Sequence, residues 1–433
     1  MPQLSTATPP LAGLLKAWRQ SDCPDRVADG WRESAATRPP GKPDFLEPQQ
    51  IEECRVFAGL GTEFEPMLQE TASRIAADLG LAAFAWHTYR RAYIDSETVT
   101  FDSWPELEQP LGRNARILYV ILALASIPLM RRRHTALGIP EQIARDTASD
   151  VVASIRRGAL SRPDLPGLAP RELDWFQHHA NASVFRIGRL QYRFRPFDGA
   201  IRIFRNPGSG ETAAIAEPGG FFDSHGYRVP KPENRLATEE LWESRLEETK
   251  DGIVANPVSP EGIVLRDQQL LPWSEWQLLV APGDPVFEVH IPAGGGLTLA
   301  QCRQSMREAV AFHARHFAAD PQPRIFSCMT WFLGPQLREI LPETANILQF
   351  QRAVYLFPIE TRTNEGFYFI FGKDELPDRL PENATGLQTS IYQYVRAGNP
   401  WRGGGMFFPA KDVDSFGNAR SPWFKFQSKT NDR

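Results

Sequence analysis

The hydrophobic spacing of this chain changes once, and that change limits the folds it can adopt. From residue 49 to about residue 157, apolar residues recur three and four positions apart, as in FEPMLQETASRIAADLGLAAFAWHTYRRAY. After residue 182 they alternate with arginines instead, as in SVFRIGRLQYRFRPF. A period near 3.6 indicates amphipathic helices, and a period of 2 indicates half-buried strands. The sequence therefore predicts a helical part followed by a part built on β-sheet.

The domain boundaries follow from this change and from the prolines. A chain of 433 residues exceeds one ordinary core, so we expect two domains after an N-terminal segment. Residues 1–45 are rich in proline and are predicted to be irregular, apart from a short helix at 11–19. Residues 46–160 are predicted to form the α-helical domain. The stretch SRPDLPGLAP indicates an exposed linker, and residues 173–433 then form the second domain.

The longest apolar run, Ile117–Met130, is predicted to be a buried helix. It is shorter than the roughly 20 residues that cross a bilayer. Pro128 is expected to kink or end this helix. The start of the chain, MPQLSTATPP, lacks the basic start and apolar core of a signal peptide. We therefore expect a cytoplasmic protein without a membrane partner.

Charge and cysteine content narrow the function. A formal net charge of −4 argues against binding to nucleic acid. The cysteines lie far apart without CxxC spacing, which predicts reduced thiols rather than disulfides, and no metal site is expected. They are Cys23, Cys54, Cys302 and Cys328.

The second part mixes predicted strands with predicted helices, and this order indicates an α+β domain. Its first element is predicted to be a β-hairpin over residues 182–206, with a Phe-Asp-Gly turn. Further strands are predicted at Gly226–Val229, Gly262–Leu265, Glu275–Val280, Val286–Ile291, Arg324–Leu333, Ala353–Pro358 and Phe367–Phe371. Helices are predicted at Leu299–Phe317, Pro335–Leu341 and Leu387–Ala397.

One stretch, VHIPAGGGLTLAQ, poses a functional question. Alternation places Glu288 and His290 on the same face of the predicted strand. Thr298 is predicted to cap the helix that follows, with Gln301 three residues later. Three glycines before a helix N-terminus suit an anion, because their backbone can approach a ligand closely. The pattern also fits a plain strand-to-helix connection, and both interpretations remain open at this point.

Four motifs carry a resemblance to a known family: FEVHIPAGGGLT, FSCMTWFLGPQL, PETANILQFQRAVYLFPI and YVRAGNPWRGGGMFF. With them the chain resembles a bacterial acyltransferase-like family, over roughly residues 50–420. Its members join a helical N-terminal domain to a GNAT-like acyltransferase domain. The resemblance implies an α+β fold in which the helical domain precedes a GNAT-like mixed sheet with flanking helices.

The resemblance also implies an activity. Family members would use acetyl-CoA or another acyl-CoA as co-substrate and pass the acyl group to an amine, here an unknown small molecule or peptide. The pyrophosphate loop would be Ala293, Gly294, Gly295 and Gly296. The GNAT loop pattern Q/R-x-x-G-x-G/A starts with a glutamine or arginine, which this chain lacks at that place. The helix GPQLREIL also lacks the tyrosine acid that many GNAT enzymes carry, and Tyr355 lies beyond it.

Candidate catalytic residues remain open to more than one interpretation. Acyl transfer to an amine needs a base, and His290 supported by Glu288 is our candidate, the alternative being a polar strand face. Asn346 is a candidate for ligand binding or for a turn. Cys328 could be the nucleophile of a Cys-dependent hydrolase, or a buried thiol. A further alternative is a non-catalytic binding or regulatory protein that keeps the fold.

Overall fold

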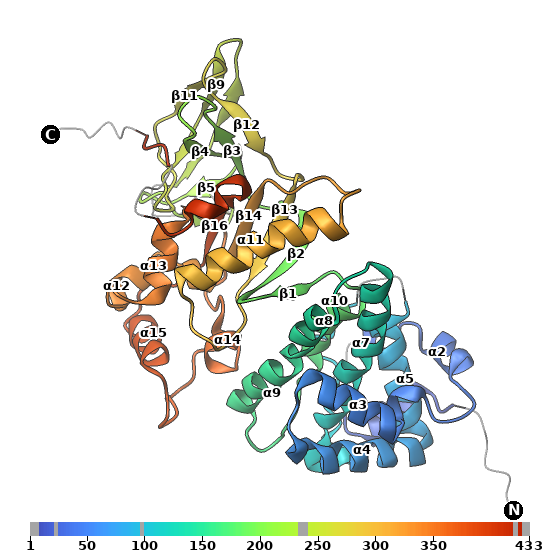
Figure 1. The fold of residues 1–433 in the computed structure, drawn as a ribbon. Helices are drawn as coiled ribbons and strands as arrows, with labels where there is room; N and C mark the ends of the chain where they lie inside the picture. Colours follow the sequence, from blue (N-terminus) through green and yellow to red (C-terminus); the bar gives the residue numbers. More distant parts are fainter. Residues whose placement is uncertain (1–7, 21–24, 96–98, 233–240, 419–422, 427–433) are drawn as a thin grey trace, which may run out of the picture. The chain divides into compact units, whose positions relative to one another are not determined.

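The computed structural model describes residues 8–20, 25–95, 99–232, 241–418 and 423–426 (Figure 1). The chain divides into two compact units, Met1–Arg186 and Ile187–Arg433. The first is helical, and the second combines β-sheets with helices. The predicted α+β class, with the helical part first, is confirmed.

The helical unit is organised around α7, which is buried on nearly all sides. A helix that is apolar all round must lie inside other helices, and α3, α4, α5, α8, α9 and α10 contact it. The helix does not end at Pro128 but continues to Ala136. The helices of this unit are α1 (Leu11–Ala17), α2 (Trp31–Thr37), α3 (Pro48–Ala58), α4 (Glu65–Ala77), α5 (Leu79–Tyr93), α6 (Glu108–Leu111), α7 (Ile117–Ala136), α8 (Glu141–Ala148), α9 (Asp150–Ser161) and α10 (Leu173–Ala180).

The apolar helix α7 is also the segment to compare with a membrane-spanning helix. Among the described residues, no single helix has the length and apolar character to cross a bilayer. The segments Glu108–Asn114 and Ile117–Ala136 meet that test only as a pair, and they are bent by 74°.

The unit boundaries differ from the predicted ones. The N-terminal segment contains the predicted short helix, as α1, and also α2, which was not predicted, and Leu11 packs into the helical core. The predicted linker is exposed only in part: Pro163 and Asp164 are exposed, but Leu168 is fully buried and its amide donates to the carbonyl of Arg116. The division falls instead between Arg186 and Ile187. The apolar residues between the prolines made this segment part of the core.

The second unit holds several sheets, and its largest has the strand order β1-β2-β13-β14-β16-β15 in the described residues. Within it β13 and β14 are parallel, while β13–β2, β14–β16 and β15–β16 are antiparallel. The smaller sheets have the orders β10-β4-β3-β12, β11-β9-β8 and β6-β5-β7. The strands are β1 (Phe185–Ile187), β2 (Leu190–Pro196), β3 (Ile201–Arg205), β4 (Thr212–Ala216), β5 (Phe221–Phe222), β6 (Arg228–Val229), β7 (Trp242–Glu243), β8 (Leu246–Glu248), β9 (Gly252–Ala255), β10 (Pro257–Val258), β11 (Gln269–Pro272), β12 (Gln277–Val280), β13 (Pro285–His290), β14 (Ile325–Thr330), β15 (Tyr355–Phe357) and β16 (Gly404–Pro409).

The predicted hairpin over residues 182–206 is wrong. Its two strands, β2 and β3, enter different sheets, and β2 pairs with β1 and β13 instead. A tight hairpin turn needs a residue with positive φ, and Gly199 is not among the glycines that adopt one. The amide of Phe197 donates to the carbonyl of Asp284, so the pairing of β2 with β13 continues past Pro196. The chain therefore does not turn back along β2 at this point.

The helices of this unit are α11 (Leu299–His316), α12 (Leu337–Ile340), α13 (Asn346–Ala353), α14 (Phe367–Phe371) and α15 (Gly386–Arg396). The strand predicted at Phe367–Phe371 is α14. Its buried residues Phe367, Ile370 and Phe371 are three and four apart, which is helical spacing, while Phe369 is exposed. The strand predicted at Gly262–Leu265 is reduced to an isolated bridge between Val264 and Val258.

Helix α11 lies across one face of the largest sheet (Figure 1). Thr298 caps it by accepting a hydrogen bond from the amide of Gln301, as predicted. Cys302 and Met306 are buried on its inner side. On the sheet, Phe287 of β13 stacks on Phe326 of β14 with ring centroids 4.7 Å apart. This apolar layer fixes the helix against the two parallel strands.

The turn between β1 and β2 is tied to α11 by one buried hydroxyl. Ser305 donates to the carbonyl of Ile187 and accepts from the amide of Leu190 at 3.1 Å. It also lies 2.9 Å from the hydroxyl of Tyr192. Because all of these groups are buried, removing the hydroxyl would take a hydrogen-bond partner from each of them.

We therefore predict that Ser305→Ala lowers the free energy of unfolding by about 2 kcal/mol, the usual cost of leaving buried polar groups unsatisfied. Gln304→Ala is the matched control, because Gln304 is exposed on the same helix. Urea denaturation of both variants measures the difference. Equal stability of the two variants would contradict the prediction.

Candidate functional site

The parallel strands β13 and β14 are paired over only two positions. Phe287 pairs with Phe326 and Glu288 with Ser327, and the ladder stops there. Both strands nevertheless continue: β13 stays paired with β2 as far as His290, and β14 stays paired with β16 as far as Thr330. The two strands therefore part after Glu288, and the opening between them faces the C-terminal ends of both.

A polar cluster lies at the point where the strands part. Nε2 of His290 is 3.1 Å from Oε2 of Glu288, so the predicted pair is in contact. Nη1 of Arg195 donates to Oε1 of Glu288 at 2.7 Å, and Nη1 of Arg193 lies 3.4 Å from Oε2. The side chain of Glu288 is 17% exposed and that of His290 is 31% exposed. The carboxylate is thus more buried than the imidazole, which is partly exposed to solvent.

The two arginines were not predicted as site residues. They come from β2, where alternation places Arg193 and Arg195 on one face. The repeated arginines of RLQYRFR were visible in the sequence as a strand pattern. Their partner could not be read from it, because the pairing of β2 with β13 depends on the sheet order.

The cluster keeps Glu288 ionised. Burial acts to raise the pKa of this carboxyl, but the hydrogen bonds with His290 and Arg195 and the charge of Arg193 outweigh it and lower the pKa to about 2. A carboxylate with so low a pKa is a weak base. It instead favours the tautomer of His290 that carries its proton on Nε2, which places the lone pair of the neutral ring on Nδ1.

The glycine loop follows β13 directly. Gly294, Gly295 and Gly296 have φ values of 81°, 73° and 69°, a left-handed conformation that side chains disfavour. All three are exposed, and a Cβ added at Gly294 or Gly296 would meet no atom within 4 Å. Among the described residues, none of these three amides donates a hydrogen bond to the protein. The loop thus presents unused donors at the N-terminus of α11, as an anion site requires.

A cation reaches this loop from elsewhere in the chain. Arg189, in the turn between β1 and β2, donates from Nε to the carbonyl of Gly296. The sequence places no arginine within the loop, and residue 189 is about a hundred positions away. Only the anchoring of the β1–β2 turn to α11 brings the two together.

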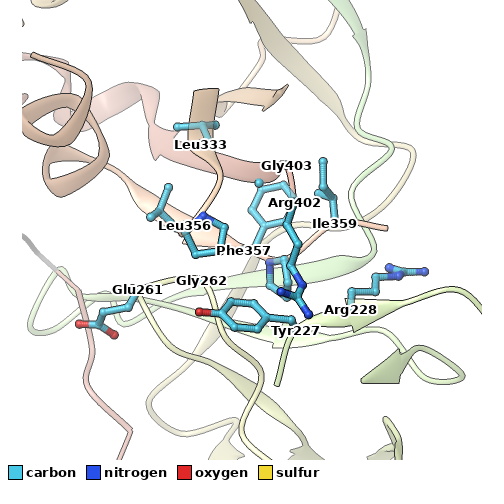
Figure 2. A pocket seen from close by; sticks show the side chains of 13 residues that line it. Tyr227, Arg228, Glu261, Gly262, Leu333, Leu356, Phe357, Ile359, Arg402 and Gly403 are labelled. Carbon is cyan, nitrogen blue, oxygen red and sulfur yellow. The ribbon is translucent and has the colours of Figure 1, made fainter. Parts of the chain in front are cut away.

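Two hollows lie near the largest sheet. The smaller lies beside Glu288 and is lined by Arg195, Pro196, Asp198, Val286, Ser327, Cys328 and Met329. The larger contains about 290 Å³ of space open to solvent at the ends of β15 and β16 (Figure 2). There the guanidinium of Arg402 lies 4.8 Å from the ring centroid of Tyr227 and donates to Asp223 at 3.0 Å. Two further charged residues, Arg228 and Glu261, also line it. Its apolar lining is Leu333, Pro335, Leu356, Phe357, Pro358 and Ile359.

Three other residues were considered from the sequence: Cys328, Tyr355 and Asn346. Burial raises the pKa of the Cys328 thiol to about 12, so the thiolate that a nucleophile needs is disfavoured at neutral pH. Tyr355 is fully buried, donates to the carbonyl of Val258 and stacks on Phe407. Asn346 is the exposed first residue of α13, so it lies in a helix rather than a turn.

Metal ligands were not expected, and the described residues contain no group of three or more His, Cys, Asp or Glu side chains that could hold a metal ion. Cys54, Cys302 and Cys328 are free and buried. Cys23 lies outside the described residues.

A parallel pair that parts beside a strand–glycine loop–helix unit defines a GNAT-like acyltransferase domain. Comparison with protein families agrees: residues 184–408 match the GNAT-like C-terminal domain, and residues 60–180 match the N-acyltransferase N-terminal domain. The first match covers more than half of the 433 residues. The chain therefore belongs to this family of N-acyltransferases.

Solved structures show the same fold. An acyltransferase in complex with decanoyl-CoA and teicoplanin is 19% identical, with a TM-score of 0.50, and the match covers 83% of this chain and 99% of that one. An acyltransferase in complex with CoA and 10C-teicoplanin gives the same values. A comparison with curated protein sequences finds no match.

The Glu288 cluster predicts a pH dependence of stability. The pKa of Glu288 is about 2 in the folded protein and 4.5 ordinarily, so ionised Glu288 stabilises the fold above about pH 4.5. That contribution, about 3 kcal/mol at pH 7, should be lost as the pH falls from about 5 toward 2. The stability difference between the protein and Glu288→Gln should shrink over that range in denaturation experiments.

Glu275→Gln provides the control, since Glu275 is an exposed carboxylate in the turn before β12. Its stability difference from the unaltered protein should stay small from pH 7 to pH 3. If Glu288→Gln behaved like Glu275→Gln, the arginines and His290 would not stabilise the carboxylate.

Proposed function

We propose that this protein transfers an acyl group from acyl-CoA to a primary amine, with acyl-CoA bound between β13 and β14. The observation that carries the proposal is the short parallel ladder: it ends at Glu288 and Ser327 while both strands continue. Backbone groups that would have continued the ladder need other partners. The amides of a pantetheine chain supply them.

The glycine loop is the proposed site for the pyrophosphate. It stands at the open end of the two strands and precedes α11, an 18-residue helix whose N-terminal dipole favours negative charge. The amides of Gly294, Gly295 and Gly296 are unused donors in the described part of the chain. The related acyltransferase structures contain CoA or decanoyl-CoA, which supports this choice of co-substrate.

His290 is the proposed base. The amine must lose a proton as its nitrogen attacks the thioester carbonyl, the new C–N bond forms and the C–S bond breaks, releasing CoA. Glu288 accepts from Nε2 of His290 and thereby leaves Nδ1 as the basic nitrogen. Glu288 itself is a positioning residue, because its low pKa makes it a poor base.

The acceptor is proposed to be an amine of a small molecule or peptide. The hollow in Figure 2 combines apolar walls with Tyr227 and Arg402, which suits a molecule with both apolar and polar groups. It lies at the end of β16 where Gly404 pairs with Thr330, the last residue of β14. One related structure contains teicoplanin together with decanoyl-CoA, which supports a binding site for an acceptor in this fold.

Binding of CoA is predicted to raise the melting temperature. Ligand at 100 times its dissociation constant adds about 2.7 kcal/mol to stability. Gly295→Val should remove this protection, because valine cannot keep a φ of 73° without strain. Gly283→Val is the matched control: Gly283 is also exposed, has a φ of 93° and has open space around it, but lies outside the loop. If CoA still protected Gly295→Val but no longer protected Gly283→Val, CoA would bind at a site other than the glycine loop.

Catalysis is predicted to depend on His290. His290→Ala should lower kcat by about 10²- to 10⁴-fold, the usual scale for loss of a general base, without changing the Kd of CoA. Release of free CoA from acyl-CoA in the presence of a panel of primary amines measures the rate. Glu288→Gln should also lower kcat, through the orientation of the imidazole. Normal turnover in His290→Ala would leave His290 as a polar residue on a half-buried strand, and absence of turnover in the unaltered protein with every amine would favour a binding role.

A further inference from the structure

The glycine loop carries no charge of its own. From Pro292 to Cys302 the chain has no lysine or arginine. A diphosphate needs cationic or hydrogen-bonding partners, and amides alone leave its charge uncompensated. Arg303 follows directly in the second turn of α11, and Arg189 reaches the loop itself from the turn between β1 and β2.

Arg189 is placed to be that partner. Its Nε donates to the carbonyl of Gly296. A Cβ built on Gly295 would lie 3.9 Å from the same nitrogen. The guanidinium thus lies against two of the three glycines.

The position of Arg189 is determined by buried contacts on both sides of it in the chain. Ser305 binds the carbonyl of Ile187 and the amide of Leu190, the residues that flank the turn. Ser305 belongs to α11, and the N-cap of the same helix, Thr298, ends the glycine loop. One helix therefore holds both the loop and the arginine, which limits the distance between them.

We propose that Arg189 is the cationic contact for the diphosphate of CoA and takes the place of the side chain that the loop lacks. This proposal rests on the function proposed above. A guanidinium suits the role because it is always charged and its planar donors match phosphate oxygens in pairs. Arg189 would then decide the preference for CoA over a thioester that lacks the nucleotide.

A purely structural role predicts a different result. If Arg189 only held the loop in place through Gly296, its loss would weaken the binding of every thioester between β13 and β14. If it contacts the diphosphate, only ligands with that group should be affected. Octanoyl-CoA, octanoyl-dephospho-CoA and S-octanoylpantetheine separate the two roles, because the first two keep the diphosphate and the third has none.

The experiment is titration calorimetry of these three probes with the full chain, Arg189→Met and Arg189→Lys. In Arg189→Met, the Kd of octanoyl-CoA and of octanoyl-dephospho-CoA should rise at least tenfold, and the Kd of S-octanoylpantetheine should stay within twofold. Arg189→Lys should recover part of the loss, since it restores the charge without the paired donors. Arg315→Met is the control, an exposed arginine near the other end of α11.

The outcomes separate this inference from the proposed function. Tight octanoyl-CoA binding that Arg189→Met does not change would overturn the role of Arg189 and leave the acyl-CoA site standing. An equal loss of affinity for S-octanoylpantetheine would also overturn this role, and would show that Arg189 only holds the loop in place. No binding of octanoyl-CoA to the unaltered protein would overturn the inference and the proposed function together.

Discussion

The early end of the ladder between β13 and β14 is the constraint on which the rest of the site depends. Two residue pairs hold the strands together, and the stacked rings of Phe287 and Phe326 support them from the α11 face. Beyond that point each strand is held only by its outer neighbour, β2 or β16. The antiparallel strands on both sides thus keep an opening that a parallel pair alone would close, and the proposed acyl-CoA site follows from it.

The electrostatics of the opening come from β2. Arg193 and Arg195 lie opposite β13 and compensate the carboxylate of Glu288, which would otherwise be costly to keep charged in a half-buried place. The compensated carboxylate in turn holds the imidazole of His290. Strand alternation, sheet order and the pKa of one carboxyl are therefore linked, and a change in the pairing of β2 would disturb all three.

Several features could be predicted from local pattern. The strand through Val286–His290, the turn at the glycines, the Thr298 cap and the face shared by Glu288 and His290 all depend on neighbours within a few residues. The predictions failed where distant partners decide. The strand predicted at Phe367–Phe371 is a helix between two left-handed glycines, and the predicted hairpin of β2 and β3 is divided between sheets.

The sequence by itself determined the two classes of unit, the glycine loop and the face shared by Glu288 and His290, because periodicity and capping are local properties of the chain. Only the tertiary structure decided which charged side chains contact these residues. Arg193 and Arg195 reach Glu288 through strand order, and Arg189 reaches Gly296 because Ser305 holds a turn against α11. Such contacts join residues about a hundred positions apart, and their distances follow from the packing of the sheet and not from any spacing in the sequence.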